Sequence, residues 1–265
     1  MDLTGRTVLV TGSNRGIGRA IAKAVAAKPV GLLLCGTRSP EEYPPLPRPA
    51  GGAREIRPVA LDLSSQESIE RSVAELGDDA REVDVLVNNA GLMTGGLLEE
   101  QETDDIYAAV QVNLTAVMHL TKLLLPGMLE RGSGKVVNNA SISGYAYFPA
   151  ATTYAATKAG VVAFTESLRR ETKGTGVTTL HLVTPGVDTD MLDETDEVYG
   201  RHIDTTTWDR QPPAEWAAKV VDAIEHDKTI LGPGGKTAIA KLASRGPGFL
   251  VDGISARMFS RTPRG

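Results

Sequence analysis

The sequence is poor in cysteine, in long apolar runs and in net positive charge. Cys35 is the single cysteine among 265 residues, which excludes an internal disulfide and a metal site built from several cysteines. No run of about 18 apolar residues predicts a membrane span, and the first residues lack the apolar core of a signal peptide. A net charge of −5 argues against a general nucleic-acid binder. These absences predict a soluble protein of a reducing compartment, the cytoplasm.

The composition permits a large folded core. Hydrophobic residues make up 41% of the chain and charged residues 23%, which argues against wholesale disorder. Short apolar runs alternate with helical periods of apolar residues, and the chain contains neither an internal repeat nor a dividing linker. The sequence therefore predicts one domain over 1–265. Its expected fold is α/β, a single Rossmann-type doubly wound parallel sheet with helices on both faces.

A glycine-rich turn follows the first expected strand, 7–11, and precedes a helical period. Its glycines allow a tight turn and the approach of a pyrophosphate to the helix N-terminus. A glycine-rich turn also occurs as a purely structural connection, but the position directly after the first strand favours a nucleotide site. The turn consists of Gly12, Ser13, Asn14, Arg15, Gly16, Ile17 and Gly18.

The end of the second expected strand, 30–35, is where dinucleotide folds meet the adenosine ribose. An acid at that point binds the 2′-hydroxyl, whereas an arginine accommodates a 2′-phosphate. Residues 36–39 contain no acid but include Arg38, and Arg15 lies in the glycine turn. The two arginines favour NADP(H) over NAD(H), unless both simply face water as surface charges do. The next segment, 40–49, holds five prolines and predicts an extended surface loop.

Tyr154 and Lys158 are four residues apart and share one face of an expected helix, 153–173. A nearby ammonium lowers the pKa of a phenol, and a phenol with a pKa near neutrality exchanges a proton with a carbonyl or alcohol oxygen. Alone the pair means little, because chance places it on ordinary exposed helices. Small residues at 88–91, after a fourth expected strand, strengthen it because they let a flat ring approach the backbone at the ligand-binding edge of the sheet.

A long helical period over 104–131 contains Asn113. Asparagine has a poor helix propensity, so this side chain either faces water or has a function. Pro126 is expected to kink or end the helix. The helices over 104–131 and 153–173 carry more apolar surface than one sheet face covers, which predicts a homodimer or a homotetramer.

These motifs together resemble the short-chain dehydrogenase/reductase family over about residues 1–190. The separation of thirteen residues from Tyr154 favours Ser141 over Ser143 as the serine of the motif. The sequence departs from the family pattern at 138–140, in the proline-rich segment and in the tail. The matching features are Thr11-Gly12-x-x-x-Gly16-Ile17-Gly18, Asp62 with Leu63, Asn88-Asn89-Ala90-Gly91, the set Asn113, Ser141, Tyr154 and Lys158, and Pro185-Gly186-Val187-x-Thr189.

The resemblance implies an NADP(H)-dependent oxidoreductase that interconverts a ketone or aldehyde and an alcohol by hydride transfer. Tyr154 is the expected general acid/base, and Ser141 is expected to hold the carbonyl oxygen. Lys158 is expected to lower the tyrosine pKa and bind the nicotinamide ribose, and Asn113 to hold a water in a proton relay. The implied cofactor-binding residues are the seven of the glycine turn, Arg38, Asp62, Leu63, Asn89, Ala90, Gly91, Tyr154, Lys158, Pro185, Gly186, Val187 and Thr189.

The substrate side is expected to be apolar and to favour a neutral or weakly polar ketone or secondary alcohol. Residues 187–211 show no strong periodicity and contain six acids between 188 and 197, which predicts a substrate lid. Residues 236–265 form a basic extension with six Lys or Arg residues and one acid. The expected substrate residues are Met93, Ser141, Ile142, Tyr147, Met191 and Leu192.

Two other functions fit the same motifs. One is a nucleotide-binding sensor or scaffold that kept the fold without turnover, although the complete tetrad argues against it. The other is a dehydratase or epimerase on the same fold, because the tetrad and the cofactor do not fix the net reaction.

Overall fold

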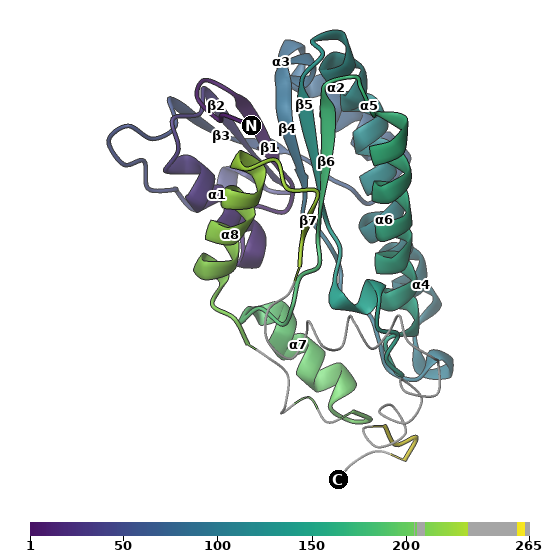
Figure 1. Cartoon of the computed structure of the whole chain (residues 1–265). Coiled ribbons are helices and arrows are strands. Elements are labelled where there is room, and N and C mark those ends of the chain that lie inside the picture. The colour runs from purple at the N-terminus through teal and green to yellow at the C-terminus, as the bar shows by residue number, and fades with distance from the viewer. Residues whose placement is uncertain (204, 206–209, 233–258, 263–265) are drawn as a thin grey trace.

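The computed structural model describes residues 1–203, 205, 210–232 and 259–262. A seven-stranded parallel sheet forms its centre, in the order β3-β2-β1-β4-β5-β6-β7 (Figure 1). The strand order reverses between β1 and β4, which is where open α/β sheets bind ligands. The strands are β1 (Thr7–Val10), β2 (Leu32–Thr37), β3 (Glu55–Ala60), β4 (Val83–Asn88), β5 (Gly134–Asn139), β6 (Val177–Leu182) and β7 (Ile230–Leu231).

Helices cover both faces of the sheet. Figure 1 shows α1 and α8 on one face, α4, α5 and α6 on the other, and α7 beyond the carboxyl ends of the strands. The expected α/β fold with helices on both faces is therefore confirmed. The helices are α1 (Gly16–Ala26), α2 (Gln66–Leu76), α3 (Asp78–Glu82), α4 (Thr103–Val110), α5 (Ala116–Glu130), α6 (Thr152–Glu171), α7 (Asp190–Tyr199) and α8 (Pro213–Glu225), with short turns η1 (Pro40–Glu42), η2 (Leu98–Glu100), η3 (Gln111–Thr115) and η4 (Ile142–Gly144).

The core consists of one apolar layer on each side of the sheet. Side chains alternate along a strand, so Val8 and Val10 of β1 pack towards α1 and α8, while Leu9 packs towards α5. Trp216 of α8 fills the first layer and Leu120 of α5 the second, and both are fully buried. Burial on both faces explains why the strands of this parallel sheet are nearly continuous apolar runs.

Two expected helices are interrupted in the structure. The apolar period of Ile69, Val73 and Leu76 predicts one helix over 66–80, but α2 ends at Leu76, because Gly77 has a positive φ of +57° and α3 starts after it. The helix expected over 104–131 consists of α4, a π-helical turn at η3 and α5. Pro126 lies inside α5, which continues to Glu130. The helix therefore does not end at this proline. Leu124 and Met128 are buried against the sheet, and this packing offsets the missing backbone hydrogen bond.

The proline-rich segment begins with the 3₁₀ turn η1 and continues without regular structure, as expected for a surface loop. Two side chains fix it to the neighbouring elements. The Tyr43 phenol donates a hydrogen bond to the Ser13 carbonyl at 3.0 Å. Arg19 of α1 donates to the carbonyls of Pro44 and Pro45 at 2.8 and 3.1 Å. The loop therefore supports the glycine-rich turn from outside.

The segment expected to be a structureless lid contains the helix α7. Its two ends meet, because Val187 forms a parallel bridge with Gln211 and the Asp188 N–H donates to the Gln211 carbonyl at 3.0 Å. Arg210 at this base pairs with Asp188 and Asp193. Most of the basic extension over 236–265 lies outside the described residues.

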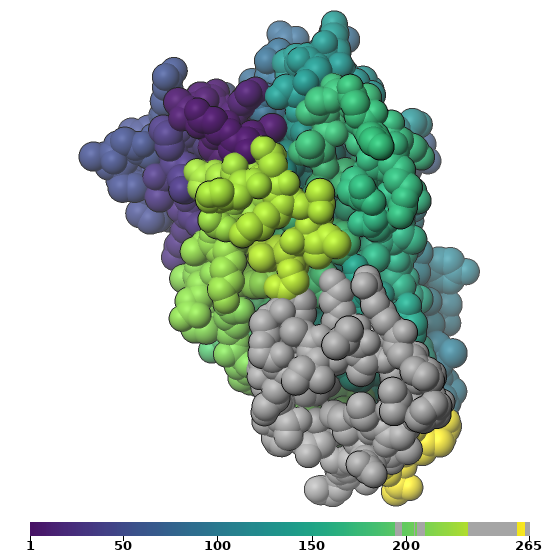
Figure 2. Space-filling view, viewed as in Figure 1, coloured from purple at the N-terminus to yellow at the C-terminus, as the bar shows by residue number. Residues whose placement is uncertain are grey.

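The N-terminus packs against the end of α8. The Met1 ammonium lies 2.7 Å from Asp227 Oδ2 and donates to the Glu225 carbonyl at 2.7 Å. Figure 2 shows the purple N-terminal residues beside the light-green surface that α8 forms on this face.

One helical stretch of the described chain, Thr103–Glu130, is long and apolar enough to cross a membrane by length and composition. The mean hydropathy of its most apolar window is 1.3, and 39% of that window is buried. A core helix of a soluble protein meets the same criterion, so this helix is no evidence of a membrane span.

Candidate active site

The glycine-rich turn packs directly against the end of β4. A Cβ atom on Gly12 would lie 3.0 Å from the Cα of Ala90, and one on Gly18 would lie 2.1 Å from the Gly12 carbonyl oxygen. Gly16 has a φ of +53°, a conformation that side chains rarely adopt, and a Cβ there would lie 3.6 Å from Thr189 Cγ2. The absence of side chains therefore leaves a cradle between the turn, β4 and the segment after β6, and this cradle fits a pyrophosphate at the N-terminus of α1.

A chain of side-chain hydrogen bonds joins the carboxyl ends of four strands. Asn89 donates to the Thr11 carbonyl at 3.2 Å, and Asn139 donates to Asn89 Oδ1 at 3.0 Å. Thr184 then donates to Asn139 Oδ1 at 2.5 Å. Asn139 is one of the positions at which the sequence departs from the family pattern. The structure uses it to connect the carboxyl ends of β1, β4, β5 and β6.

Ser141, Tyr154 and Lys158 come together although they lie on different elements. Ser141 precedes η4, whereas Tyr154 and Lys158 lie on the first turns of α6. The Lys158 ammonium lies 5.6 Å from the centre of the Tyr154 ring and donates to the Asn139 carbonyl at 2.9 Å. The Ser141 hydroxyl is close enough to the Tyr154 phenol to lower the pKa of that phenol. Ser141, the serine that the spacing favoured, therefore lies beside Tyr154.

Burial controls the proton affinities of this cluster. Burial raises the pKa of Tyr154 to about 12, and the hydrogen bond with Ser141 offsets only part of that increase. Burial also lowers the pKa of Lys158 to about 8. The sequence predicted that Lys158 lowers the tyrosine pKa, but the surrounding residues by themselves push both groups towards their neutral forms. At neutral pH the site therefore holds a protonated phenol, which can donate a proton.

Asn113 is buried in the π-helical turn η3 and does not face water. Its side chain accepts a hydrogen bond from the Leu92 N–H at 2.7 Å and donates to the Leu92 carbonyl at 2.9 Å. It also donates to Thr157 Oγ1 at 3.3 Å. A Cβ on Gly91 would lie 3.3 Å from Asn113 Oδ1 and 3.7 Å from Lys158 Nζ. Asn113 thus ties the segment after β4 to α6 beside Lys158.

The residues expected at the adenosine end are more exposed. Asn14, Arg15 and Arg38 are exposed. Asp62 is half-buried and accepts hydrogen bonds from the backbone and hydroxyl of Ser64, both at 3.0 Å. Leu63 is buried, and so is Ser13, whose hydroxyl donates to the Gly36 carbonyl at 3.2 Å.

Tyr199, the last residue of α7, dominates the apolar cluster that α7 forms with the segments after β4 and β5. Its side chain is 3% exposed and its phenol donates to the Thr94 carbonyl at 3.2 Å, with Met93 Sδ also at 3.2 Å. A Cβ on Gly95 would lie 1.9 Å from Tyr199 Cε1, so the ring rests on bare backbone. Burial raises the pKa of Tyr199, and the charge of an ionised Tyr154 raises it further. The cluster also includes Ala150, Ala151, Ile203, Phe148, Val198 and Phe259.

The structure brings together some expected substrate residues and separates one of them. Met93 lies in the Tyr199 cluster, Leu192 is buried on α7, and Met191 is half-buried beside it. Tyr147 is 63% exposed and lies outside the cluster. The sequence pattern does not single out Tyr199, although Leu192 and Tyr199 are seven residues apart, the spacing that places two residues on one helix face.

Comparisons with known proteins agree with this geometry. A family model described as short chain dehydrogenase matches residues 6–200. The 3-oxoacyl-[acyl-carrier-protein] reductase FabG of Haemophilus influenzae is 35% identical over 235 residues, which cover 85% of this chain and 92% of the relative. The protein of the same name from Vibrio harveyi is 36% identical over 200 residues, which cover 72% of this chain and 77% of the relative.

Solved structures show the same fold. A short-chain dehydrogenase from Streptomyces avermitilis has a TM-score of 0.75 at 27% identity, covering 97% of this chain and 96% of that one. A short chain dehydrogenase from Burkholderia cenocepacia, solved in complex with NADP, has a TM-score of 0.78 at 22% identity. The alignment with the second structure covers 98% of this chain and all of that one.

The lowered pKa of Lys158 predicts how stability depends on pH. An unfolded lysine keeps its proton up to about pH 10.5, whereas the folded Lys158 releases it above about pH 8. Between pH 8 and 10 the unfolded chain therefore binds more protons, and the free energy of unfolding rises with pH, by roughly 2 kcal/mol in the limit of full linkage. Urea unfolding at pH 8, 9 and 10 measures the slope.

The matched variant is Lys158→Met, which keeps the length of the side chain and removes the titrating group. Its slope over the same pH range is expected to be flatter than that of the unsubstituted protein. Equal slopes for the two proteins would contradict a buried Lys158 with a lowered pKa. Above pH 10 the raised pKa of Tyr154 acts in the opposite direction, so the comparison ends there.

Proposed function

The chain belongs to the short-chain dehydrogenase family and is therefore an oxidoreductase that acts on CH–OH or C=O groups, and we propose that it is an NADP(H)-dependent ketone reductase with Tyr154 as its general acid/base. One observation carries the proposal: Tyr154, Ser141 and Lys158 cluster beside the glycine cradle at the carboxyl edge of the sheet. The same groups support the reverse reaction, because a general acid in reduction is a general base in oxidation.

The residues at the carboxyl edge fit a dinucleotide. The cradle formed by the glycine turn receives the pyrophosphate, and Asn89, Ala90 and Gly91 offer backbone to a flat ring. Arg15 and Arg38 are the exposed cations for a 2′-phosphate. The nicotinamide ring, when bound, supplies or takes up the hydride. The remaining proposed contacts are Asp62 and Leu63 at the adenine, Lys158 at the ribose, and Pro185, Gly186, Val187 and Thr189 at the carboxamide end.

The protein's own groups handle the proton and the orientation of the substrate. In reduction, Tyr154 donates its phenolic proton to the developing alkoxide. Ser141, whose hydroxyl lies beside that phenol, holds the same oxygen. Lys158 has a pKa of about 8 and stands next in line to restore the proton on Tyr154. Asn113 holds the Leu92 backbone beside Lys158, and we propose that a water at this point passes protons to the ammonium.

The substrate side supports a neutral ketone or secondary alcohol. The Tyr199 cluster is apolar, and the nearby acids Asp188 and Asp193 are exposed and paired with Arg210, so they do not place charge in the cluster. Met93, Ile142, Met191 and Leu192 remain the proposed apolar contacts. The relatives named 3-oxoacyl-[acyl-carrier-protein] reductases make a 3-oxoacyl thioester one member of the panel to be tested.

We also propose that the protein is cytoplasmic and forms a homodimer or homotetramer through α4 and α5. Large apolar side chains on these helices are exposed, namely Tyr107 at 74%, Val110 and Met118 at 38%, and Leu129 at 41%. Association of two copies would remove this surface from water.

Tyr154→Phe should lower kcat by about 10²- to 10⁴-fold, because it removes the proton donor and keeps the ring. NADPH binding, measured by fluorescence titration, should stay within about twofold. Tyr107→Phe, an exposed tyrosine on α4, is the matched control and should keep full activity. Near-normal turnover by Tyr154→Phe would remove this residue from the mechanism.

Arg38→Asp should reverse part of the cofactor preference, because a carboxylate repels a 2′-phosphate and accepts a hydrogen bond from a 2′-hydroxyl. The ratio of kcat/KM for NADPH to that for NADH is expected to fall by about tenfold or more. Arg54→Asp, a basic residue at the start of β3, controls for the change in net charge. An unchanged ratio for Arg38→Asp would exclude Arg38 from the 2′-phosphate site.

Tyr199→Ala should raise KM for a small ketone by about tenfold and admit bulkier ketones, because the ring that fills the cluster is removed. Gly95→Ala should act in the same direction, because its Cβ would overlap the Tyr199 ring. Tyr147 is an expected substrate residue that the structure leaves exposed. Tyr147→Ala should therefore leave KM within about twofold of the unsubstituted value. Equal effects of Tyr147→Ala and Tyr199→Ala across a panel of ketones would refute this assignment.

A further inference from the structure

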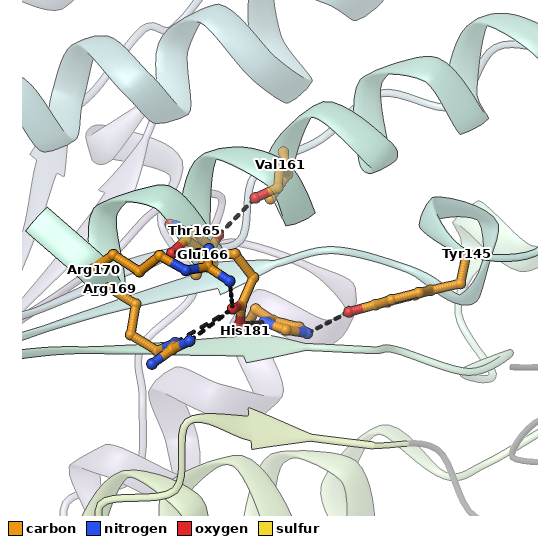
Figure 3. A network of polar contacts seen from close by, with 8 residues as sticks. Tyr145, Val161, Thr165, Glu166, Arg169, Arg170 and His181 are labelled. Carbon is orange, nitrogen blue, oxygen red and sulfur yellow. Dashed lines mark hydrogen bonds and ion pairs between the residues drawn. The ribbon is translucent and has the colours of Figure 1, made fainter. Parts of the chain in front are cut away.

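A buried histidine lies between a tyrosine and a glutamate near the catalytic cluster. His181 of β6 is 1% exposed, and its Nε2 lies 2.6 Å from the Tyr145 hydroxyl. Its Nδ1 lies 3.6 Å from Glu166 Oε1, which is an ion-pair distance. Figure 3 shows the Tyr145 phenol pointing at the imidazole and Glu166 on the far side of the ring. We call Tyr145, His181 and Glu166 the Tyr145 network.

The outer end of the network is fixed by two arginines of α6. Arg169 donates to Glu166 Oε2 at 3.0 Å, and Arg170 donates to the Glu166 carbonyl at 2.8 Å (Figure 3). The hydrogen bond from Arg169 is the main cause that lowers the pKa of Glu166, so this carboxylate stays ionised. An ionised carboxylate favours the tautomer with a proton on Nδ1, which leaves Nε2 to accept from the Tyr145 hydroxyl.

The inner end of the network belongs to the segment that carries Ser141. The Gly144 N–H donates to the Ser141 carbonyl at 3.0 Å, and the Tyr145 N–H donates to the Ile142 carbonyl at 2.9 Å. A Cβ on Gly144 would lie 2.8 Å from the Lys158 carbonyl oxygen, so this segment presses on α6. Ser141 and Tyr145 are therefore the two ends of one tight turn, and a displacement of Tyr145 displaces Ser141.

We propose that the Tyr145 network is a positioning device, in which Tyr145 and His181 hold the Ser141 turn at the distance from Tyr154 that proton transfer requires. The inference rests on the proposed function, because it assigns the network a role only through Ser141 and Tyr154. The network connects the turn after β5 to β6 and to α6 three turns beyond Tyr154. It thereby links the turn that carries Ser141 to α6, the helix that carries Tyr154.

The proton on His181 decides the direction of the hydrogen bond with Tyr145. A neutral imidazole that carries its proton on Nδ1 accepts from the Tyr145 hydroxyl through Nε2, whereas an imidazolium donates from Nε2 to the Tyr145 oxygen. Among the described residues, the charged groups that face the His181 ring are Glu166, Arg169 and Arg170. Glu166 favours the imidazolium form, and the two arginines oppose it. Tyr145 is the other titratable group in contact. Both forms of His181 can therefore keep the hydrogen bond to Tyr145, so the contact between the two side chains is what holds the Ser141 turn.

The test compares two substitutions that differ in which polar atom they keep. His181→Gln places an amide oxygen near the position of Nε2 and accepts from Tyr145 without titrating. His181→Asn keeps a polar atom only near Nδ1, and Tyr145→Phe removes the hydroxyl. Thr179→Val is the matched control, because Thr179 is buried on the same face of β6 and its hydroxyl makes no hydrogen bond among the described residues. The assay is oxidation of NADPH with a ketone that the unsubstituted protein reduces.

Tyr145→Phe and His181→Asn should lower kcat by about 10- to 100-fold, the loss expected from a misplaced catalytic group. KM for NADPH should stay within about twofold, and the double variant should lose no more than either single variant. His181→Gln and Thr179→Val should keep most of kcat.

A second measurement needs neither cofactor nor turnover. The chain has four histidines, and the ¹⁵N signals of their side chains report the protonation of each one directly. The signal that disappears in His181→Gln is that of His181. Tyr145→Phe should change the titration of His181 and leave the other three unchanged. An unaltered titration of His181 in Tyr145→Phe would contradict the proposed role of the Tyr145 network. Equal losses of kcat in His181→Gln and His181→Asn would also contradict it.

The two proposals fail in different ways. If the unsubstituted protein oxidises no NADPH with any ketone, or if Tyr154→Phe keeps its rate, the proposed function fails. If the unsubstituted protein turns over and Tyr154→Phe does not, while Tyr145→Phe keeps full kcat, only the network fails.

Discussion

The hydrogen bonds of the Asn139 carboxamide are the interaction on which the rest of the site depends. Parallel strands end at one edge of the sheet, and their last polar groups need partners there once the edge is covered. Asn139 meets this need by bonding to Asn89 on one side and Thr184 on the other. The backbone carbonyl of Asn139 also accepts a hydrogen bond from the Lys158 ammonium. One residue thus sets the spacing between the glycine cradle, the segment after β6 and Lys158.

Desolvation gives the site its chemical character. Burial favours the neutral forms of both Tyr154 and Lys158, so the phenol keeps its proton and the lysine holds its own less tightly. A protonated phenol next to a lysine with a pKa of about 8 is a donor with a nearby source of replacement. This arrangement suits reduction of a carbonyl group, where the oxygen gains a proton as the carbon gains a hydride.

Local sequence predicted the parts of the molecule that depend on local physics. Alternating apolar runs and helical periods indicated the parallel sheet. Close backbone contacts require the glycines at 12 and 18, and a positive φ favours glycine at 16. The strand boundaries moved by one or two residues. Long-range packing decided the remainder. The helix α5 continues through Pro126 because its buried face packs on the sheet, and Tyr199 packs on the segment after β4 because Gly95 leaves room for its ring. Neither effect is visible in a short window of sequence.

The transfer of label from deuterated NADPH tests the central claim most directly. The protein is incubated with NADPH deuterated at C4, separately on each face, and with a panel of ketones, and the alcohol is analysed by mass spectrometry. The account predicts that NADPH labelled on one face places one deuterium on the carbinol carbon for each NADPH oxidised. An alcohol without deuterium from either labelled cofactor, or binding of NADPH without consumption across the whole panel, would contradict it.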